Sequence, residues 1–233
     1  MIRLTIARYY TPSGRCIQKP YEKGNKKAYA EDILNRSKDG EYYNIDSIHF
    51  NDTLKYSTLK NHRPIYGGGG IMPDIFVPVD TSEYSTYYRD LVAKGIVNQF
   101  SINYVDKHRK QLKKRYADIK AFDKGFELSD AEMKDFIAAG EKDSVKYNEK
   151  QYETSKQVLK MIMKGIIGRD VYSDPSAYTI IVNHRNQMLD EAVKVLNDDK
   201  RYNELLTKGN AEYEKLAAKH KAEKEAKAAK AKK

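Results

Sequence analysis

Hydrophobic and polar positions in the N-terminal third of the chain suggest short extended elements broken by turns. Residues 2–10 alternate like a strand, and 12–14 (Pro-Ser-Gly) carry a turn signal. The polar stretch that follows predicts one short helix at 28–37 and one strand at 41–48. Residues 71–77 form a short apolar run interrupted by a proline, which predicts an extended segment at a sheet edge.

After residue 79 the apolar spacing changes to that of helices. Apolar side chains at 158, 159, 162, 163, 166 and 167 follow the helical repeat and predict the strongest amphipathic helix, with Gly168 expected just beyond its end. Ser129 and Glu132 have the spacing of a capping box before a further helix.

Residues typical of helix starts and ends predict further helices in this part of the chain. Thr81 or Ser82 is a candidate N-cap for a first helix, and Gly95 is a candidate break. Pro175 after an aspartate predicts a helix start. The apolar positions of 188–196 give a last helical face, and a Lys/Ala/Glu run from residue 212 onward predicts a solvated helix without a core face.

These patterns predict an α+β fold that is mainly α. Residues 1–80 hold the short strands, with an insertion at about 19–66 between two strands of one sheet. Residues 81–210 form a helical domain, and 211–233 form a Lys/Ala/Glu-rich tail that is expected to be disordered or a free helix.

Charge and composition argue against several classes of protein and of site. The 233 residues carry a net charge of +10, but the eight lysines and two glutamates from Lys215 onward account for +6 of it. The small net charge of the residues before Lys215 does not indicate a nucleic-acid-binding protein. No apolar run approaches the roughly 18 residues of a membrane span. The single cysteine, Cys16, excludes an internal disulfide and a cysteine-based zinc site.

The residues alone give no catalytic constellation. The five histidines are scattered and none belongs to a HExxH motif, so we expect no metal site and no cofactor. The glycine run at 67–70 is followed by Ile-Met rather than Lys-Ser or Lys-Thr, which indicates a close-packed or mobile turn before a strand instead of a phosphate loop.

Two segments nevertheless resemble the C-terminal processing peptidases, also called tail-specific proteases. Residues 4–18 read LTIARYYTPSGRCIQ, which is similar to the strand and turn that follow that family's catalytic centre. Residues 70–77 read GIMPDIFV, which resembles the family's next signature, Gly-Ile-x-Pro-Asp-Ile-x-Val. Both occur in the family's order. In many relatives they lie only a few residues apart, whereas about fifty residues separate them here, which indicates an insertion.

The resemblance implies a serine endopeptidase with a Ser–Lys dyad, often assisted by a glutamine and usually accompanied by a PDZ domain. A buried lysine with a depressed pKa can replace histidine as the base. In that family the serine, the lysine of a Gly-Lys-Gly and the glutamine all precede the strand that residues 4–10 resemble. We therefore expect the catalytic residues upstream of Met1, assign none to this chain, interpret Ser13 as a turn residue, and expect the chain alone to be inactive.

Other expectations also depend on the resemblance. Arg8 and Arg15 are speculative supports of the substrate groove, against an equally good structural reading of the strand and turn. The implied partners are protein or peptide substrates and the N-terminal protease core, and the implied location is the periplasm or cell envelope.

Two alternatives from other classes stay open. The helical part could be a scaffold or interaction module without catalysis. A less favoured alternative is a basic nucleic-acid-binding protein, whose affinity would fall steeply with salt.

Overall fold

The computed structural model describes residues 1–233 except 1, 3, 5, 22, 210 and 232–233. Over these residues helices dominate, and the only sheet has two short strands, which confirms the mainly α fold of class α+β. The chain divides into two compact units, 80–189 on one side and 1–79 with 190–233 on the other. The sequence-based boundary at residue 80 adjoins this division. The boundary expected near residue 210 does not, because 190–233 group with the N-terminal segment.

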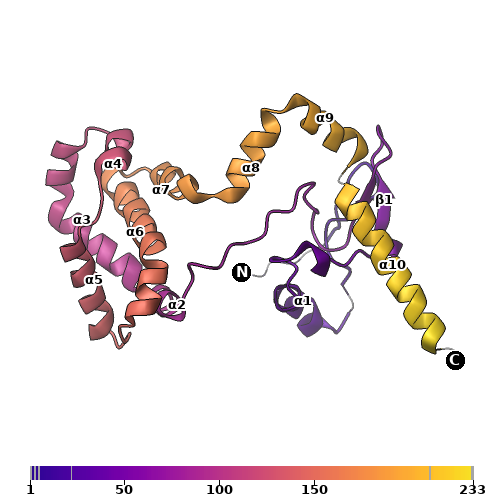
Figure 1. The fold of residues 1–233 in the computed structure, drawn as a ribbon, viewed down its shortest axis with the longest axis horizontal. Coiled ribbons are helices and arrows are strands. Elements are labelled where there is room, and N and C mark those ends of the chain that lie inside the picture. Colours follow the sequence, from indigo (N-terminus) through magenta and orange to yellow (C-terminus); the bar gives the residue numbers. More distant parts are fainter. Residues whose placement is uncertain (1, 3, 5, 22, 210, 232–233) are drawn as a thin grey trace. The chain divides into compact units, whose positions relative to one another are not determined.

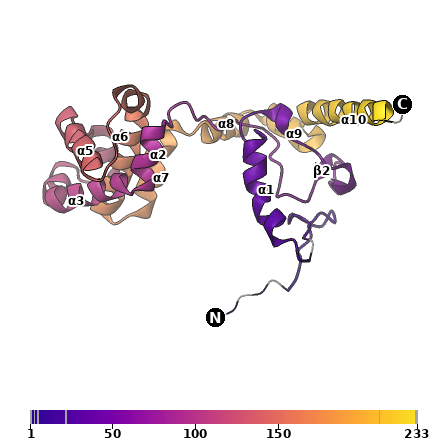
Figure 2. The same cartoon turned by 90° about the horizontal axis from the view of Figure 1, so that it is seen from below.

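The unit of residues 80–189 is built around one long helix. Its helices are α2 (Thr86–Ala93), α3 (Ile96–Arg115), α4 (Ile119–Gly125), α5 (Asp130–Lys142), α6 (Glu149–Tyr172), α7 (Pro175–Val182) and the short η3 (Asn183–Arg185). Helix α6 contacts α2, α3, α4 and α7; Figure 1 shows it among them, and Figure 2 shows α2 and α7 beside it. We call this part the helical unit.

Helix α6 confirms the strongest amphipathic prediction but not its predicted end. Val158, Leu159 and Ile167 are among its buried residues. The helix continues past Gly168 to Tyr172 and ends at Ser173, whose φ of 54° is left-handed. Gly168 serves packing instead: a Cβ there would lie 3.1 Å from the Phe122 ring and 3.2 Å from Ile181 Cδ1. A glycine that looks like a helix stop can thus mark a close approach inside a core.

Most of the predicted helix ends are correct. The Ser129 hydroxyl accepts a bond from the Glu132 amide, and the Glu132 carboxylate accepts one from the Ser129 amide at 2.6 Å, which confirms the capping box. Pro175 begins α7 behind an Asp174 cap, and Gly95 breaks α2 from α3 with a φ of 73°. The predicted cap of the first helix was wrong.

Ser85, rather than Thr81 or Ser82, caps α2. Its hydroxyl accepts a hydrogen bond from the Tyr88 amide. It also lies 2.8 Å from the hydroxyl of Ser155, which is fully buried on α6 and donates to the Glu83 carbonyl at 2.6 Å. A buried hydroxyl from a distant helix therefore fixes where α2 starts, and local sequence does not reveal it.

Hydrogen bonds to Glu132 predict an acid-sensitive feature of the helical unit. Burial raises the pKa of Glu132, but hydrogen bonds from the Tyr104 hydroxyl, at 2.6 Å, and from Ser129 outweigh it and lower that pKa. A lowered carboxyl pKa stabilises the fold above the ordinary value of about 4.3, and this stabilisation is lost as the pH falls through the lowered pKa. We expect Tyr104→Phe to raise the pKa of Glu132 and to move acid unfolding to higher pH.

The carboxyl ¹³C shift of Glu132, followed from pH 7 to 2, measures this pKa directly. Tyr84→Phe is the matched control, because Tyr84 is an exposed tyrosine of the same unit that donates no hydrogen bond to a carboxylate among the described residues. An unchanged titration midpoint for Glu132 in Tyr104→Phe would contradict the assignment of the cause.

The second unit combines both ends of the chain, and we call it the terminal unit. It contains α1 (Lys26–Lys38), the short helices η1 (Ile45–Ser47) and η2 (Asp52–Leu54), the strands β1 (Lys55–Ser57) and β2 (Pro64–Tyr66), and the helices α9 (Asp199–Lys208) and α10 (Ala211–Ala231). Helix α8 (Gln187–Leu196) crosses the division between the units. The strands pair antiparallel with Tyr56 opposite Ile65.

In this unit the structure confirms the predicted helix and the predicted turn but not the predicted strands. Helix α1 confirms the helix predicted at 28–37. The turn at 12–14 is confirmed: the Gly14 amide donates to the Thr11 carbonyl at 2.8 Å, and Gly14 has a φ of 80°. Tyr10 and Cys16 form a bridge across this turn. Residues 71–77 carry no strand in the structure.

Both longer strands that the sequence predicted were wrong. At residues 2, 4 and 6–9 there is no strand, and 1, 3 and 5 lie outside the described residues. A strand needs hydrogen-bonded neighbours, and none of the described segments pairs with these residues. The side chains of Ile2 and Ile6 are accordingly left 87% and 94% exposed. At 41–48 turns and η1 form instead, where the Asn44 side chain accepts a bond from the Asp46 amide.

The C-terminal helix has a core face, contrary to the prediction. Leu216 on α10 is only 6% exposed and packs with Ile48 and Phe50, and Tyr213 and Ala217 are partly buried beside it. Positions 213, 216 and 217 share one helix face, so three residues suffice for a short apolar stripe that the surrounding lysines hide. Figure 1 shows α10 in yellow next to β1.

Candidate functional site

The two segments that resemble the peptidase family lie side by side in the terminal unit. The Gly68 amide donates to the Cys16 carbonyl at 3.1 Å, and the Gly70 amide donates to the Ile17 carbonyl at 2.8 Å. Residues about fifty positions apart in the sequence are thus neighbours in space. The stretch of residues 19–66 therefore begins and ends beside these hydrogen bonds.

The glycine run makes this approach possible. A Cβ on Gly67 would lie 2.9 Å from Arg15 Cγ and 3.0 Å from the Cys16 carbonyl oxygen. Gly68 has a φ of 84°, and a Cβ there would lie 2.2 Å from Leu54 Cδ1. These contacts support the interpretation of 67–70 as a close-packed turn.

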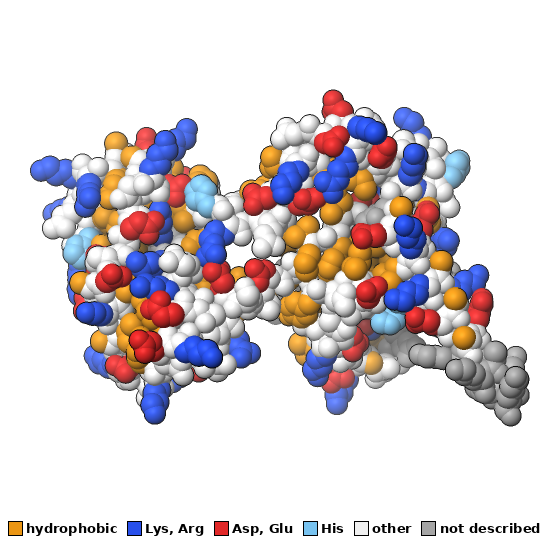
Figure 3. Space-filling view, viewed as in Figure 1, with side chains coloured by type: hydrophobic (Ala, Val, Ile, Leu, Met, Phe, Trp, Pro, Cys, Tyr) orange, Lys and Arg blue, Asp and Glu red, His pale blue; other side chains and the backbone are white. Residues whose placement is uncertain are grey.

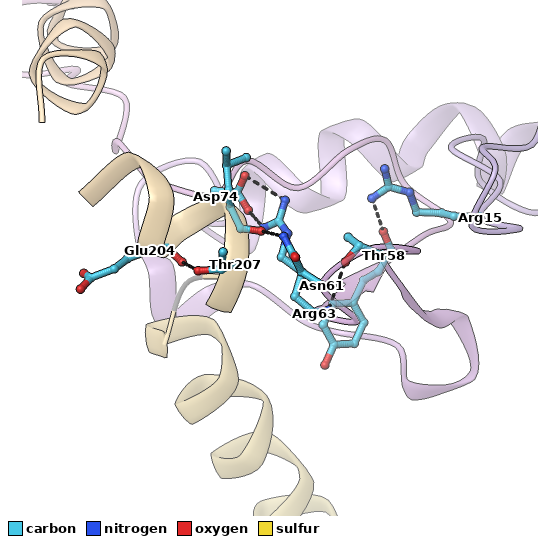
Figure 4. A network of polar contacts seen from close by, with 9 residues as sticks. Arg15, Thr58, Asn61, Arg63, Asp74, Glu204 and Thr207 are labelled. Atoms are coloured by element: carbon cyan, nitrogen blue, oxygen red, sulfur yellow. Dashed lines mark hydrogen bonds and ion pairs between the residues drawn. The ribbon is translucent and has the colours of Figure 1, made fainter. Parts of the chain in front are cut away.

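Of the two arginines singled out from the sequence, Arg15 reaches a cavity and Arg8 does not line it. Arg15 is half-buried, and its Nη1 donates to the Tyr66 carbonyl at 3.4 Å (Figure 4). Its Nε is buried and has no hydrogen-bond partner among the described residues. Arg8 is exposed. Neither arginine forms an ion pair in the described part of the chain.

The cavity beside Arg15 has a volume of about 610 Å³ and lies entirely within the terminal unit. Apolar and aromatic side chains from the strand region and from the second matched segment form one part of its wall, among them Phe50, Tyr66 and Met72. Helix α10 supplies another part, including Tyr213 and Ala217. We call it the Arg15 cavity.

An ion pair organises one side of the Arg15 cavity. Arg63 binds the carboxylate of Asp74 through both guanidinium Nη atoms, and its amide donates to the Thr58 hydroxyl at 3.1 Å (Figure 4). Asn61 donates to the Leu206 carbonyl at 2.8 Å and so ties the same turn to the end of α9. Sequence reasoning missed Arg63; Asp74 was visible only as part of the matched segment.

Tyr213 is the other functional candidate that the sequence did not indicate. Its hydroxyl is buried and has no hydrogen-bond partner among the described residues. Burial first, and then the carboxylates of Asp74 and Glu212, raise the pKa of Tyr213 to about 12, so the hydroxyl is a neutral donor at physiological pH. The only sequence signal was its position three residues before Leu216.

The described residues offer little that could support chemistry by themselves. They contain no group of three His, Cys, Asp or Glu side chains placed to hold a metal ion. His49 and His220 stack on each other with ring centroids 5.2 Å apart, and His184 Nε2 lies 2.6 Å from an Asp123 oxygen. The hydroxyl of Ser13 contacts that of Thr11 inside the turn. Among the helices of the described part, none is long and apolar enough to cross a membrane.

Comparison with known proteins gives one match, to the helical unit. The model of a family described as "Family of unknown function (DUF8443)" matches residues 87–173, fewer than half of the chain. These residues run from α2 to the end of α6. No curated protein and no solved structure matches.

Proposed function

We propose that this chain belongs to a C-terminal processing serine endopeptidase and supplies the part that follows a Ser–Lys dyad. The observation that carries the proposal is the backbone hydrogen bond from Gly70 to Ile17, which joins the two matched segments, and a second bond, from Gly68 to Cys16, lies two residues before the second segment. The family resemblance predicts that these segments are close neighbours, and the sequence separates them by about fifty residues.

The geometry of the intervening residues supports an insertion. Because both of its ends meet at the same hydrogen-bonded pair of segments, the 19–66 stretch can lengthen a loop without displacing the segments. Helix α1 belongs to this stretch and anchors it: Arg36 Nη1 donates to the Gly69 carbonyl at 3.0 Å, next to the point of return.

Exposed apolar side chains near the start of the chain also support the proposal. Ile2, Leu4 and Ile6 alternate in the sequence and are 87%, 76% and 94% exposed. Such a row has the pattern of a strand that lacks its sheet. In the proposed enzyme the upstream protease core supplies the neighbouring strands, and a location in the periplasm or cell envelope would follow from the same proposal.

The first test is the length of the polypeptide in its source cells. Intact mass, together with the coding DNA before Met1, is expected to show a longer product that contains a serine and a Gly-Lys-Gly. That longer protein should cleave peptides, and alanine at its serine should abolish cleavage. The 233-residue chain by itself should be inactive. A native product that starts at Met1, or a longer product without the serine and lysine, would refute the peptidase assignment.

An interaction role of the helical unit is the second candidate. It is favoured by one observation: the family model matches this unit alone and none of the segments that carry the peptidase resemblance. In an active longer protein, deletion of 80–189 should then leave cleavage of a short peptide unchanged but impair cleavage of a protein substrate. A nucleic-acid role is less favoured, because basic and acidic side chains are interspersed on the face shown in Figure 3.

A further inference from the structure

We infer that the Arg15 cavity is a binding site for an organic anion, a carboxylate carried on an apolar body. Three independent features of the cavity lead to this ligand class: two buried donors without partners, an excess of cationic side chains, and an apolar wall. The inference concerns the 233-residue chain alone and does not depend on peptidase activity.

The two buried donors call for a ligand atom that accepts hydrogen bonds. Arg15 Nε is a hydrogen-bond donor, and the raised pKa of the Tyr213 hydroxyl keeps that hydroxyl a donor as well. Both belong to residues that line the cavity, and neither has a hydrogen-bond partner within the described part of the protein. Buried donors are rarely left unsatisfied. A carboxylate accepts at both of its oxygens and donates at neither, so it is the class of group that unsatisfied donors favour.

The charges around the cavity favour an anion over a neutral acceptor. Five cationic side chains line it against two acidic ones, Asp74 and Glu214. The charges of Asp74 and Arg63 neutralise each other in an ion pair. The remaining charged side chains of the lining are four cations, Arg15 and three lysines, and one carboxylate, Glu214. The lysines, which are exposed, are Lys55, Lys208 and Lys221. A concave surface lined mainly by one sign of charge concentrates ions of the opposite sign.

The wall of the cavity selects an apolar body rather than a small inorganic ion. Phe50 and Tyr66 lie with ring centroids 4.6 Å apart, and Met72, Ile65, Pro64 and Pro73 extend the apolar lining. Inorganic phosphate would leave these side chains without contacts. The volume of about 610 Å³ lies in the range of small-molecule sites, roughly 300–1,000 Å³.

Titration calorimetry of the full chain with octanoate tests the inference, and NMR shifts of the Arg15 and Tyr213 signals locate the site. Octan-1-ol has the same body without the charge, and inorganic phosphate has the charge without the body. We expect octanoate to bind at least tenfold more tightly than either. N-acetyl-leucine, which presents its carboxylate as a peptide end does, distinguishes a peptide source of the ligand from an alkyl one.

Two conservative variants address the donors. Arg15→Lys keeps the positive charge but removes the Nε donor, and Tyr213→Phe removes one hydroxyl and keeps the ring. We expect octanoate affinity to fall about tenfold in the first and several-fold in the second. Arg8→Lys and Tyr202→Phe are the matched controls, since neither residue lines the cavity. Circular dichroism verifies that each variant is folded.

Three results would each overturn the inference. Octan-1-ol that binds as tightly as octanoate would show a site without anion preference. Phosphate that competes at the same concentration would show no role for the apolar wall. Wild-type octanoate affinity in both Arg15→Lys and Tyr213→Phe would place the ligand elsewhere.

Discussion

Alanine in place of Phe122 should lower the free energy of unfolding of the helical unit by about 3–5 kcal/mol. Phe122 on α4 is completely buried. Its ring stacks on Phe126 at a centroid distance of 4.6 Å and meets the edges or faces of Tyr116 at 5.6 Å and Tyr172 at 5.9 Å. Removal of this ring takes away the centre of an aromatic cluster and leaves a cavity that its neighbours can fill only in part.

The measurement is native-state hydrogen exchange on the full chain, which follows each unit separately. Amides of α6 should lose protection in Phe122→Ala, while amides of α1 in the terminal unit should not change. Lys120→Ala is the control, because Lys120 is exposed on the same short helix; we expect a change within about 0.5 kcal/mol. Equal protection of α6 in the two variants would show that the aromatic cluster does not stabilise the unit.

Aspartate in place of Leu216 should release α10 from the terminal unit. Leu216 on α10 is 6% exposed and packs against Ile48 and Phe50. Burial of a leucine side chain contributes roughly 1.5–3 kcal/mol, and burial of an unpaired carboxylate would cost several kcal/mol more. We therefore expect the helix to detach rather than to bury the charge.

Exchange of the α10 amides and the ring signals of Phe50 and His49 report on this release. Lys215→Asp introduces the same carboxylate one residue earlier, at an exposed position, and should leave α10 docked. Detachment in both variants would mean that net charge, not the apolar contact, holds the helix. Docking in both would mean that Leu216 contributes little.

Local signals in the sequence were sufficient for most of the helical unit. The capping box of Ser129 and Glu132, the proline at the start of α7 and the apolar stripe of α6 all depend on residues within four positions of one another. Contacts of this kind form inside a single helix, so the sequence carries them directly. The same is true of the turn at 12–14, where proline and glycine set the backbone angles.

Features that depend on a distant partner could not be predicted in the same way. The alternation at 2–10 is real, but a strand exists only where another segment supplies hydrogen bonds. Gly168 resembled a helix end until the position of Phe122 showed it to be a close contact. The start of α2 at Ser85 depends on Ser155, which is seventy positions away.

For this protein the sequence by itself determined the mainly α class, most helix positions and the two segments that resemble a peptidase family. The tertiary structure decided that these segments touch, that α10 has a core face, and that Arg15 and Tyr213 share one cavity. The physical reason is the sequence separation of the interacting residues. Helix periodicity and capping act between residues a few positions apart, whereas a cavity is formed by side chains that only the folded chain brings together.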